Sequence, residues 1–359
     1  MSTFTRSSTS TSTGSTSDGK NGTMNATTDE TLNATTTEAT RRPRLSGMTW
    51  LVWRQHRAGF WAILAATALF VAWMVYQRGE MTNFLDGYGY PAKNFDEMGN
   101  EFQQYSAALA AVSTGLQAIP ILLGVLLGAP LLAGDLENGT AKLVAAQSVS
   151  RTRWLATKLA LAGLVVVVST GLLSAAFGWW WNPVKSEATV MNWTSSEAFN
   201  NTGPVPVALT LLSVFGGVAI GVVLRRTLIA MVVTFGFTVA VQLVWGYFVL
   251  SLGNVVTVTT HKGILAANAA PSLPHGATQL DQSYLTGSGD LLGLNACVNT
   301  QTEQALNLCL KKADVVGWSV EYLPISQMNA MQWFGASILF ALTAGLVAFL
   351  FVWGRKRLV

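Results

Sequence analysis

Apolar residues gather in six long runs separated by more polar stretches. The runs cover residues 60–76, 107–133, 155–180, 205–224, 228–250 and 333–353. A helix needs about 20 consecutive apolar residues to cross the roughly 30 Å hydrocarbon core of a bilayer. The alternating segments of about ten residues that form membrane β-barrels are absent. The pattern therefore predicts an all-α polytopic membrane protein with six transmembrane helices.

Composition supports a membrane location. Half of the residues are hydrophobic and only 11% are charged, whereas soluble domains carry about 25% charged residues. Across the six runs we expect no side-chain charge and few polar groups, which argues against coupling to ion or proton flow. Gln117 and Gln242 are the most notable polar residues. They line a transport pathway or simply join helices, and the sequence leaves both interpretations open.

The distribution of basic residues predicts the orientation. With the N-terminus inside, 16 of the 22 Lys and Arg residues fall on the inner side. Cytoplasmic loops of membrane proteins carry such an excess, so both termini are expected to be cytoplasmic, in a multi-pass protein of the cell membrane. Topology explains the net charge of +4, and no nucleic-acid partner is needed to account for it.

Two regions outside the runs have distinct compositions. Residues 1–45 are rich in Ser and Thr, lack the apolar segment of a signal peptide, and predict a disordered cytoplasmic tail. The remaining domain, residues 46–359, contains an extracellular insert at 251–331, before the last helix. The only two cysteines, Cys297 and Cys309, lie in this insert, and "TEQALNLCLKKADVV" predicts a short helix carrying Cys309. A disulfide is permitted outside the cell, and two free thiols are the alternative.

The stretch "SGMTWLVWRQHRA" precedes the first run. Its Trp50, Trp53, Arg54 and Arg57 suit the headgroup zone, where rings lie half-buried and cations meet phosphates. We expect an interfacial helix in contact with membrane lipid. The alternative is a plain extension of the first transmembrane helix.

The segment between the second and third runs looks like a small folded element. Asn138 and Gly139 predict a turn, and Thr140 can cap a short amphipathic helix through Ala146. Ser148 or Ser150 can then cap the third transmembrane helix. A separate protein could dock on such an element and move the two helices that flank it.

The residues of this loop resemble a known family. "DLENGT", followed by "QSVSRTRWLATKL", is similar to the cytoplasmic loop of ABC-2-type transporter permeases, particularly actinobacterial ones. The segment "EYLPISQMNAMQWF" before the last run and the basic "GRKRLV" end are also similar, so the resemblance covers roughly residues 46–359. Two features depart from it: Asp135 stands where Glu is expected, and the Ser/Thr tail is unusual.

The resemblance implies a mechanism. In the family, two permeases pair with two ATP-binding subunits, and the loop helix docks in a groove of the ATPase. The chain would therefore form a homodimer or pair with a second permease. The matching coupling positions in this chain are Glu137, Gly139, Thr140, Gln147, Ser150 and Arg151. The interfacial helix would carry the same motion into the first transmembrane helix.

The sequence shows no catalytic machinery of its own. It has no G-x-x-x-x-G-K-[ST] loop for ATP, no Ser-His-Asp or Cys-His arrangement and no cluster of metal ligands. We therefore expect a non-enzymatic subunit without a cofactor, whose ATP is bound by the partner. The predicted function is export of an amphiphilic small molecule, peptide or lipid-like substrate. The alternative is a sensor or immunity subunit that binds an extracellular peptide or antibiotic and signals through the loop.

Overall fold

A computed structural model describes residues 48–93, 95–139, 150–264, 269–298 and 302–357. The predicted tail, residues 1–45, lies outside the described residues. Within them, six helices are long and apolar enough to cross a membrane: Val52–Tyr88, Glu97–Glu137, Thr152–Val184, Val205–Leu224, Thr227–Leu252 and Ile325–Trp353. Each contains one of the predicted apolar runs, so the six-helix prediction is confirmed.

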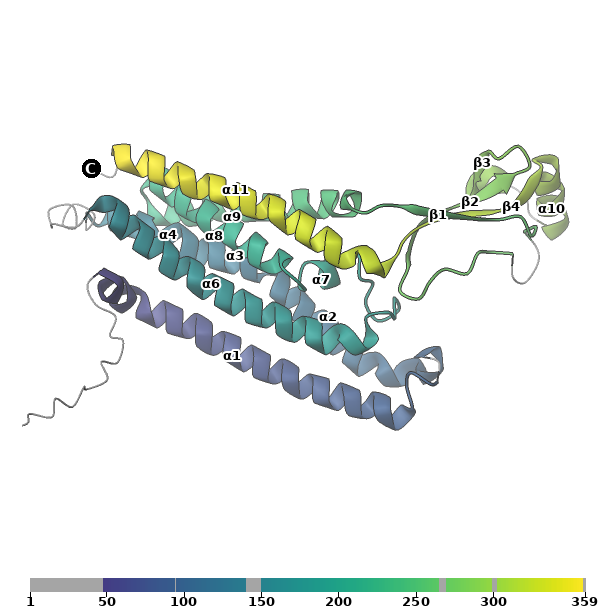
Figure 1. Ribbon diagram of the computed structural model, residues 1–359, viewed down its shortest axis with the longest axis horizontal. Coiled ribbons are helices and arrows are strands. Elements are labelled where there is room, and N and C mark those ends of the chain that lie inside the picture. Colours follow the sequence, from purple (N-terminus) through teal and green to yellow (C-terminus); the bar gives the residue numbers. More distant parts are fainter. Residues whose placement is uncertain (1–47, 94, 140–149, 265–268, 299–301, 358–359) are drawn as a thin grey trace, which may run out of the picture. The chain divides into compact units, whose positions relative to one another are not determined.

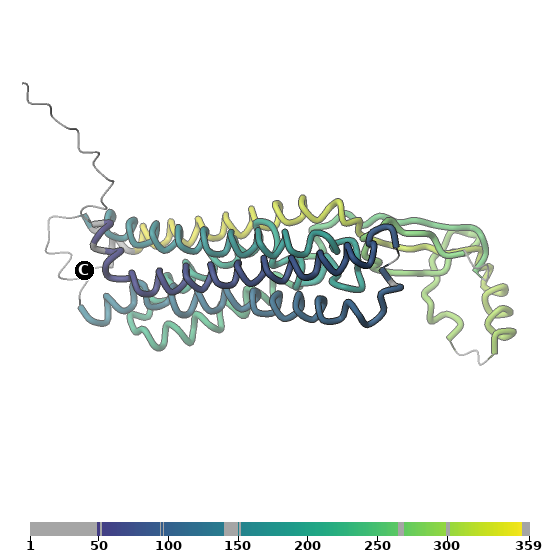
Figure 2. The backbone as a smooth tube through the Cα atoms, turned by 90° about the horizontal axis from the view of Figure 1, so that it is seen from below, coloured from purple at the N-terminus to yellow at the C-terminus, as the bar shows by residue number. Residues whose placement is uncertain are grey.

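The helical bundle is built from long helices joined by short elements (Figure 1). In chain order the helices of the bundle are α1 (Met48–Tyr88), α2 (Gln103–Gln117), α3 (Ile119–Leu123), α4 (Ala129–Glu137), α6 (Arg151–Trp181), α8 (Val205–Leu224), α9 (Thr227–Phe248) and α11 (Met328–Arg357). Shorter helical turns are η1 (Phe95–Phe102), η3 (Asn182–Val184), α7 (Ser196–Phe199), η4 (Val249–Leu252) and η6 (Ile325–Gln327). The tube in Figure 2 follows the same helices from a second direction.

The second transmembrane segment is broken twice, each time at a proline. Helix α2 ends at Gln117, and Pro120 follows in the first turn of α3. A π-helical turn, η2 (Gly124–Gly128), then separates α3 from α4, which has Pro130 in its first turn. A proline has no N–H to donate to the carbonyl four residues earlier, so regular helix cannot continue through it. The segment therefore consists of short pieces that can change direction.

Helix α8 forms the centre of the bundle. In its apolar stretch 72% of the residues are buried, whereas the corresponding share is 17% in α1 and 17% in α9. Glycines allow the neighbouring backbones to approach α8 closely: a Cβ on Gly128 would lie 2.4 Å from the carbonyl oxygen of Val214, and one on Gly221 would lie 2.5 Å from that of Ala129. Small residues at such contacts are typical of helix packing in membranes, where van der Waals contact replaces the hydrophobic effect.

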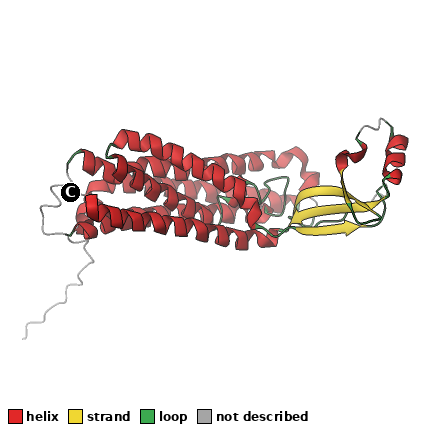
Figure 3. Ribbon diagram, turned by 90° about the horizontal axis from the view of Figure 1, so that it is seen from above, coloured by secondary structure: helices red, strands yellow, loops and turns green. Residues whose placement is uncertain are grey.

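The insert before α11 contains a β-sheet that the sequence analysis did not predict. Its strands are β1 (Val256–Thr260), β2 (Thr278–Thr286), β3 (Leu291–Gly293) and β4 (Val315–Leu323), all antiparallel in the order β1-β4-β2-β3. Figure 3 shows the sheet at one end of the helices. The Gln327 amide exchanges two hydrogen bonds with the backbone of Asn254, of 2.8 and 2.9 Å, and so fixes the start of α11 beside the approach to β1.

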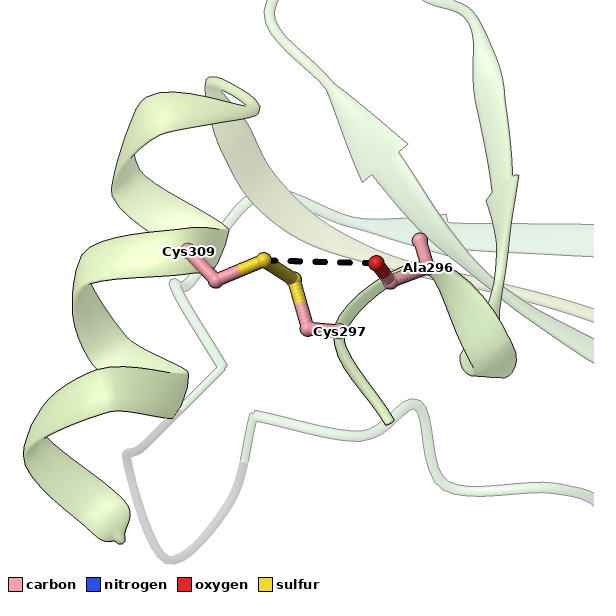
Figure 4. Close-up of a disulfide and its surroundings, with 3 residues drawn as sticks. All are labelled: Ala296, Cys297 and Cys309. Carbon is pink, nitrogen blue, oxygen red and sulfur yellow. Dashed lines mark hydrogen bonds between the residues drawn. A yellow bond between two sulfur atoms is a disulfide. The ribbon is translucent and has the colours of Figure 1, made fainter. Parts of the chain in front are cut away.

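The predicted short helix in the insert is present as α10 (Glu303–Lys312), next to the turn η5 (Leu294–Cys297). Cys297 and Cys309 form a disulfide that joins the two (Figure 4). Cys297 is buried in a small apolar cluster with Tyr284 and Leu310. The bridge therefore attaches α10 to the sheet.

Candidate functional site

A buried ion pair lies at the base of the loop that joins the second and third transmembrane segments. Lys158 on α6 contacts the carboxylate of Asp135 on α4, and its ammonium also lies 3.3 Å from the carbonyl oxygen of Leu131. The Lys158 side chain is fully buried and that of Asp135 is 10% exposed. Lys158 falls within the third predicted run, so the expectation that the runs carry no charge was wrong. The cost of burying this charge is offset by its partner.

Helix α1 joins the same cluster. The side-chain amide of Gln55 donates a 3.0 Å hydrogen bond to the second oxygen of Asp135, and the Lys158 ammonium lies 5.0 Å from the centre of the Trp154 ring. Both Asp135 oxygens are therefore engaged, one by α6 and one by α1. Sequence reasoning missed the roles of Gln55 and Lys158. The available signal was a pair of opposite charges, one on each side of the loop and both at the ends of apolar runs.

Glu137, a predicted coupling residue, contacts a different helix. Its carboxylate accepts a 2.8 Å hydrogen bond from the backbone N–H of Thr227, the first residue of α9. An anionic side chain is favourable there because the unpaired N–H groups at a helix start carry partial positive charge. Arg225, which ends α8 in a left-handed conformation with φ of 55°, makes the tight turn that brings α9 beside α4. Glu137 therefore ties the end of α4 to the start of α9.

The remaining loop positions are only partly described. Gly139 has a φ of 69°, and the turn predicted at Asn138-Gly139 is confirmed. Ser150 caps α6 by accepting a 3.4 Å bond from the N–H of Arg153, as predicted. Arg151 is the first residue of α6, but its side chain lies outside the described residues. Thr140, Gln147 and the predicted short helix at 140–146 also lie outside them.

The predicted interfacial helix is not a separate element. Residues Trp50 to Arg57 continue directly into the first transmembrane helix as one 41-residue helix, α1, as the alternative of a plain extension expects, and their contact with membrane lipid stays a prediction. Arg54 lies 5.1 Å from the centre of the Trp50 ring, and Trp53 packs on Phe60 at 5.6 Å. The reason is local: "WLVWRQHRAGF" contains no proline, and its one glycine, Gly59, keeps helical backbone inside α1.

Gln117 and Gln242 come together inside the bundle. The side-chain amide of Gln242 on α9 donates a 3.1 Å hydrogen bond to the backbone carbonyl of Gln117, at the end of α2. Both residues line a small cavity of about 30 Å³, together with Thr170, Asn200 and Asn201. The bond joins two helices and the cavity gives the same residues a polar space, so the two predicted roles are compatible.

The ends of the bundle differ in chemistry. The start of α1, the end of α4, the start of α6 and the end of α11 lie at one end, and the sheet lies at the other (Figures 1 and 3). The ion pair and Glu137 thus lie at the end opposite the sheet. At the sheet end, Tyr90 donates a 2.9 Å hydrogen bond to Glu187. The pKa of Tyr90 is raised, mainly because the phenol is partly buried and next because it bonds to the Glu187 carboxylate.

Comparison with known protein families gives a match. The family described as ABC-2 membrane transporter related matches residues 64–250, more than half of the chain, and the matched region contains the ion pair, Glu137 and the polar cavity. No curated protein and no solved structure matches the chain. Members of the family are membrane components of ABC transporters, in which the ATPase is a separate subunit. This chain, a multi-pass membrane protein, belongs to the ABC-2 membrane transporter related family.

Proposed function

We propose that the chain is the permease subunit of an ATP-binding-cassette exporter. It moves an amphiphilic small molecule, peptide or lipid-like substrate across the cell membrane, using ATP hydrolysed by a separate subunit that docks on the loop around residues 138–150. The chain contributes no cofactor. It works as a homodimer or beside a second permease, with both termini in the cytoplasm.

The observation that carries this proposal is the way the base of the loop is attached. Helix α4, before the loop, ends with Asp135 and Glu137 in its last turn, and helix α6, after the loop, carries Lys158. The ion pair joins α4 to α6, the hydrogen bond from Gln55 joins α1 to α4, and the bond between Glu137 and Thr227 joins α9 to α4. A displacement of the loop would therefore reach four helices at once.

Charge arrangement supports the same assignment. Transport driven by ions needs ionisable groups at membrane depth. The ion pair lies instead near the end of the second segment, close to the loop, and the polar cavity midway along it is lined by uncharged residues. Free energy would then have to come from a subunit that acts on the loop, and ATP hydrolysis is the source that the family offers.

The proposal is tested by purifying the full-length chain from its own membranes in mild detergent and identifying stoichiometric partners by mass spectrometry. A P-loop ATPase is expected to co-purify with the wild type and to be lost in the double variant Glu137→Lys and Arg151→Glu. Lys312→Glu, a charge reversal on α10 in the insert, is the matched control and should retain it. An intact chain without any ATPase would contradict the proposal and favour the sensor alternative.

A further inference from the structure

An apolar groove runs between α1, the α2–α3 pair and α6. It has a volume of about 330 Å³, and its walls include Phe70 on α1, Gly115 and Leu122 on α2 and α3, and Ser169 on α6. Phe70 is 45% exposed and Leu122 is 51% exposed, although both lie well inside apolar membrane spans. A Cβ on Gly115 would meet nothing within 4 Å. The groove is therefore open space whose mouth faces the hydrocarbon of the bilayer.

The groove ends against the polar cavity at Gln117 and Gln242. Leu116, Ile119 and Leu173 line both spaces, so these apolar side chains form part of the wall between them. The cavity volume, about 30 Å³, is close to the share of one water molecule in the liquid. It therefore has room for a group about as large as a hydroxyl, and the apolar groove beside it has room for a hydrocarbon chain.

The polar cavity holds unused hydrogen-bonding capacity. The side-chain amide of Gln242 donates one of its two N–H groups to the backbone carbonyl of Gln117. Among the described residues, nothing bonds to the Gln242 side-chain oxygen or to the side-chain amide of Gln117. The oxygen and the second N–H of Gln242 and the complete side-chain amide of Gln117 are therefore left for a small polar guest. No lining residue of either space is ionisable, so a charged group would lose its hydration and find no counter-charge.

The position of the polar cavity in the membrane makes its hydrogen-bonding groups selective. Gln117 lies midway along the second transmembrane segment, Glu97–Glu137, where the surrounding lipid offers no hydrogen bonds. A hydrocarbon chain gains little by leaving lipid for the groove, because both are apolar. An uncharged polar group gains hydrogen bonds that lipid cannot supply. Recognition therefore depends on the polar group.

We propose that the groove and the polar cavity together bind a single-chain amphiphile whose polar group is small and uncharged, such as the hydroxyl of a long-chain alcohol. The chain lies in the groove and the polar group bonds to Gln117 and Gln242. This inference rests on the proposed function and narrows its substrate class. It gives the amphiphile a place halfway across the membrane, within one permease chain.

The test uses the full-length chain with its co-purified ATPase in lipid nanodiscs. The probe is a long-chain primary alcohol with a photo-activated diazirine on its chain, and a chain-matched diazirine alkyl sulfate serves as the anionic comparison. After irradiation, mass spectrometry maps the labelled peptides. The alcohol is expected to label α1, α2–α3 and α6 at the groove, at least tenfold more than the sulfate does.

Two glycine variants give a matched comparison. Gly115→Leu places its side chain in the groove, from a position where a Cβ meets nothing within 4 Å, and should reduce groove labelling at least tenfold. Gly345→Leu is the same change on α11, where a Cβ also meets nothing within 4 Å, and should leave labelling unchanged. Gln117→Leu keeps the backbone carbonyl that Gln242 uses, and should bring the labelling ratio of the two probes toward one.

Several outcomes would overturn the inference. Absent groove labelling, or equal labelling of Gly115→Leu and Gly345→Leu, would show that no amphiphile occupies the groove. Equal labelling by the sulfate would remove the role of the polar cavity. Leu122→Cys forming a linked dimer on oxidation would show that a second copy covers the groove. Because ATPase co-purification is scored in the same preparation, unlabelled chain with bound ATPase contradicts only this inference, and labelled chain without ATPase contradicts the proposed function.

Discussion

The ion pair between Asp135 and Lys158 makes a quantitative prediction about stability. Lys158 is fully buried, so Asp135→Leu leaves its ammonium near the Leu131 carbonyl at 3.3 Å and the face of Trp154, without an anionic partner. Lys158→Met leaves the Asp135 carboxylate with its hydrogen bond from Gln55 but without its cationic partner. Removing one partner of a buried pair typically costs about 3–5 kcal/mol. We expect each single variant to lose stability in this range.

The double variant should behave differently. Replacing both partners, as in Asp135→Leu with Lys158→Met, removes both buried charges together, and such exchanges are often neutral or stabilising. We therefore expect the double variant to unfold within about 1 kcal/mol of the wild type, which corresponds to a coupling energy of several kcal/mol between the two positions.

The assay is reversible unfolding in mixed detergent micelles, followed by tryptophan fluorescence, for the wild type, both single variants and the double variant. Effects of the single variants that add within about 0.5 kcal/mol in the double variant would refute the reasoning. Transport by the folded double variant separates stability from coupling. If the pair transmits loop motion, this variant should retain its ATPase partner and lose substrate movement.

Three further predictions follow from particular contacts. Glu137→Gln should lower the melting temperature by removing the charge at the start of α9, and the difference from the wild type should shrink as salt is raised. Cys297 and Cys309 in intact cells should resist a membrane-impermeant thiol reagent until a reductant is added, and labelling before reduction would contradict the bridge. Replacing both by Ser should lower the free energy of unfolding by about 3 kcal/mol, since the bridge closes a loop with a sequence separation of 12. Gly128→Ala should destabilise the bundle by about 1–3 kcal/mol, because its Cβ would lie 2.4 Å from a carbonyl oxygen of α8. Gly345→Ala, at a helical position where a Cβ meets nothing within 4 Å, should not destabilise. Equal free energies of unfolding for the two variants would contradict the close approach.

The transmembrane helices could be predicted from the sequence because apolar runs of this length have one stable arrangement in a bilayer. The breaks in the second segment were also foreseeable at Pro120 and Pro130, since a proline removes a helical hydrogen bond wherever it stands. The continuous α1 was only one of two interpretations left open, because Trp and Arg near a membrane suit an interfacial helix and an extended one equally well.

The contacts of the candidate site depended on tertiary structure. Asp135 and Lys158 are 23 residues apart, and Gln55 is 80 residues from Asp135, so no local pattern joins them. Glu137 was predicted as a coupling residue from the resemblance, but its contact with α9 depends on the turn at Arg225. The sheet left a weak signal in the β-branched "VVTVTT" before and within β1. Its pairing partner β4 lies more than 50 residues later.

The distribution of burial gives the loop attachments a mechanical meaning. Helix α8 is 72% buried and closely packed through Gly128 and Gly221, so it resists displacement. In the apolar stretches of α1 and α9 only 17% of the residues are buried, and polar contacts through Gln55 and Glu137 tie these two helices to the loop. A push on the loop therefore reaches the helices with the least packing to oppose it, while α8 serves as the fixed reference. Because α1 forms one wall of the apolar groove and α9 supplies Gln242 to the polar cavity, movement of these two helices would change both spaces together.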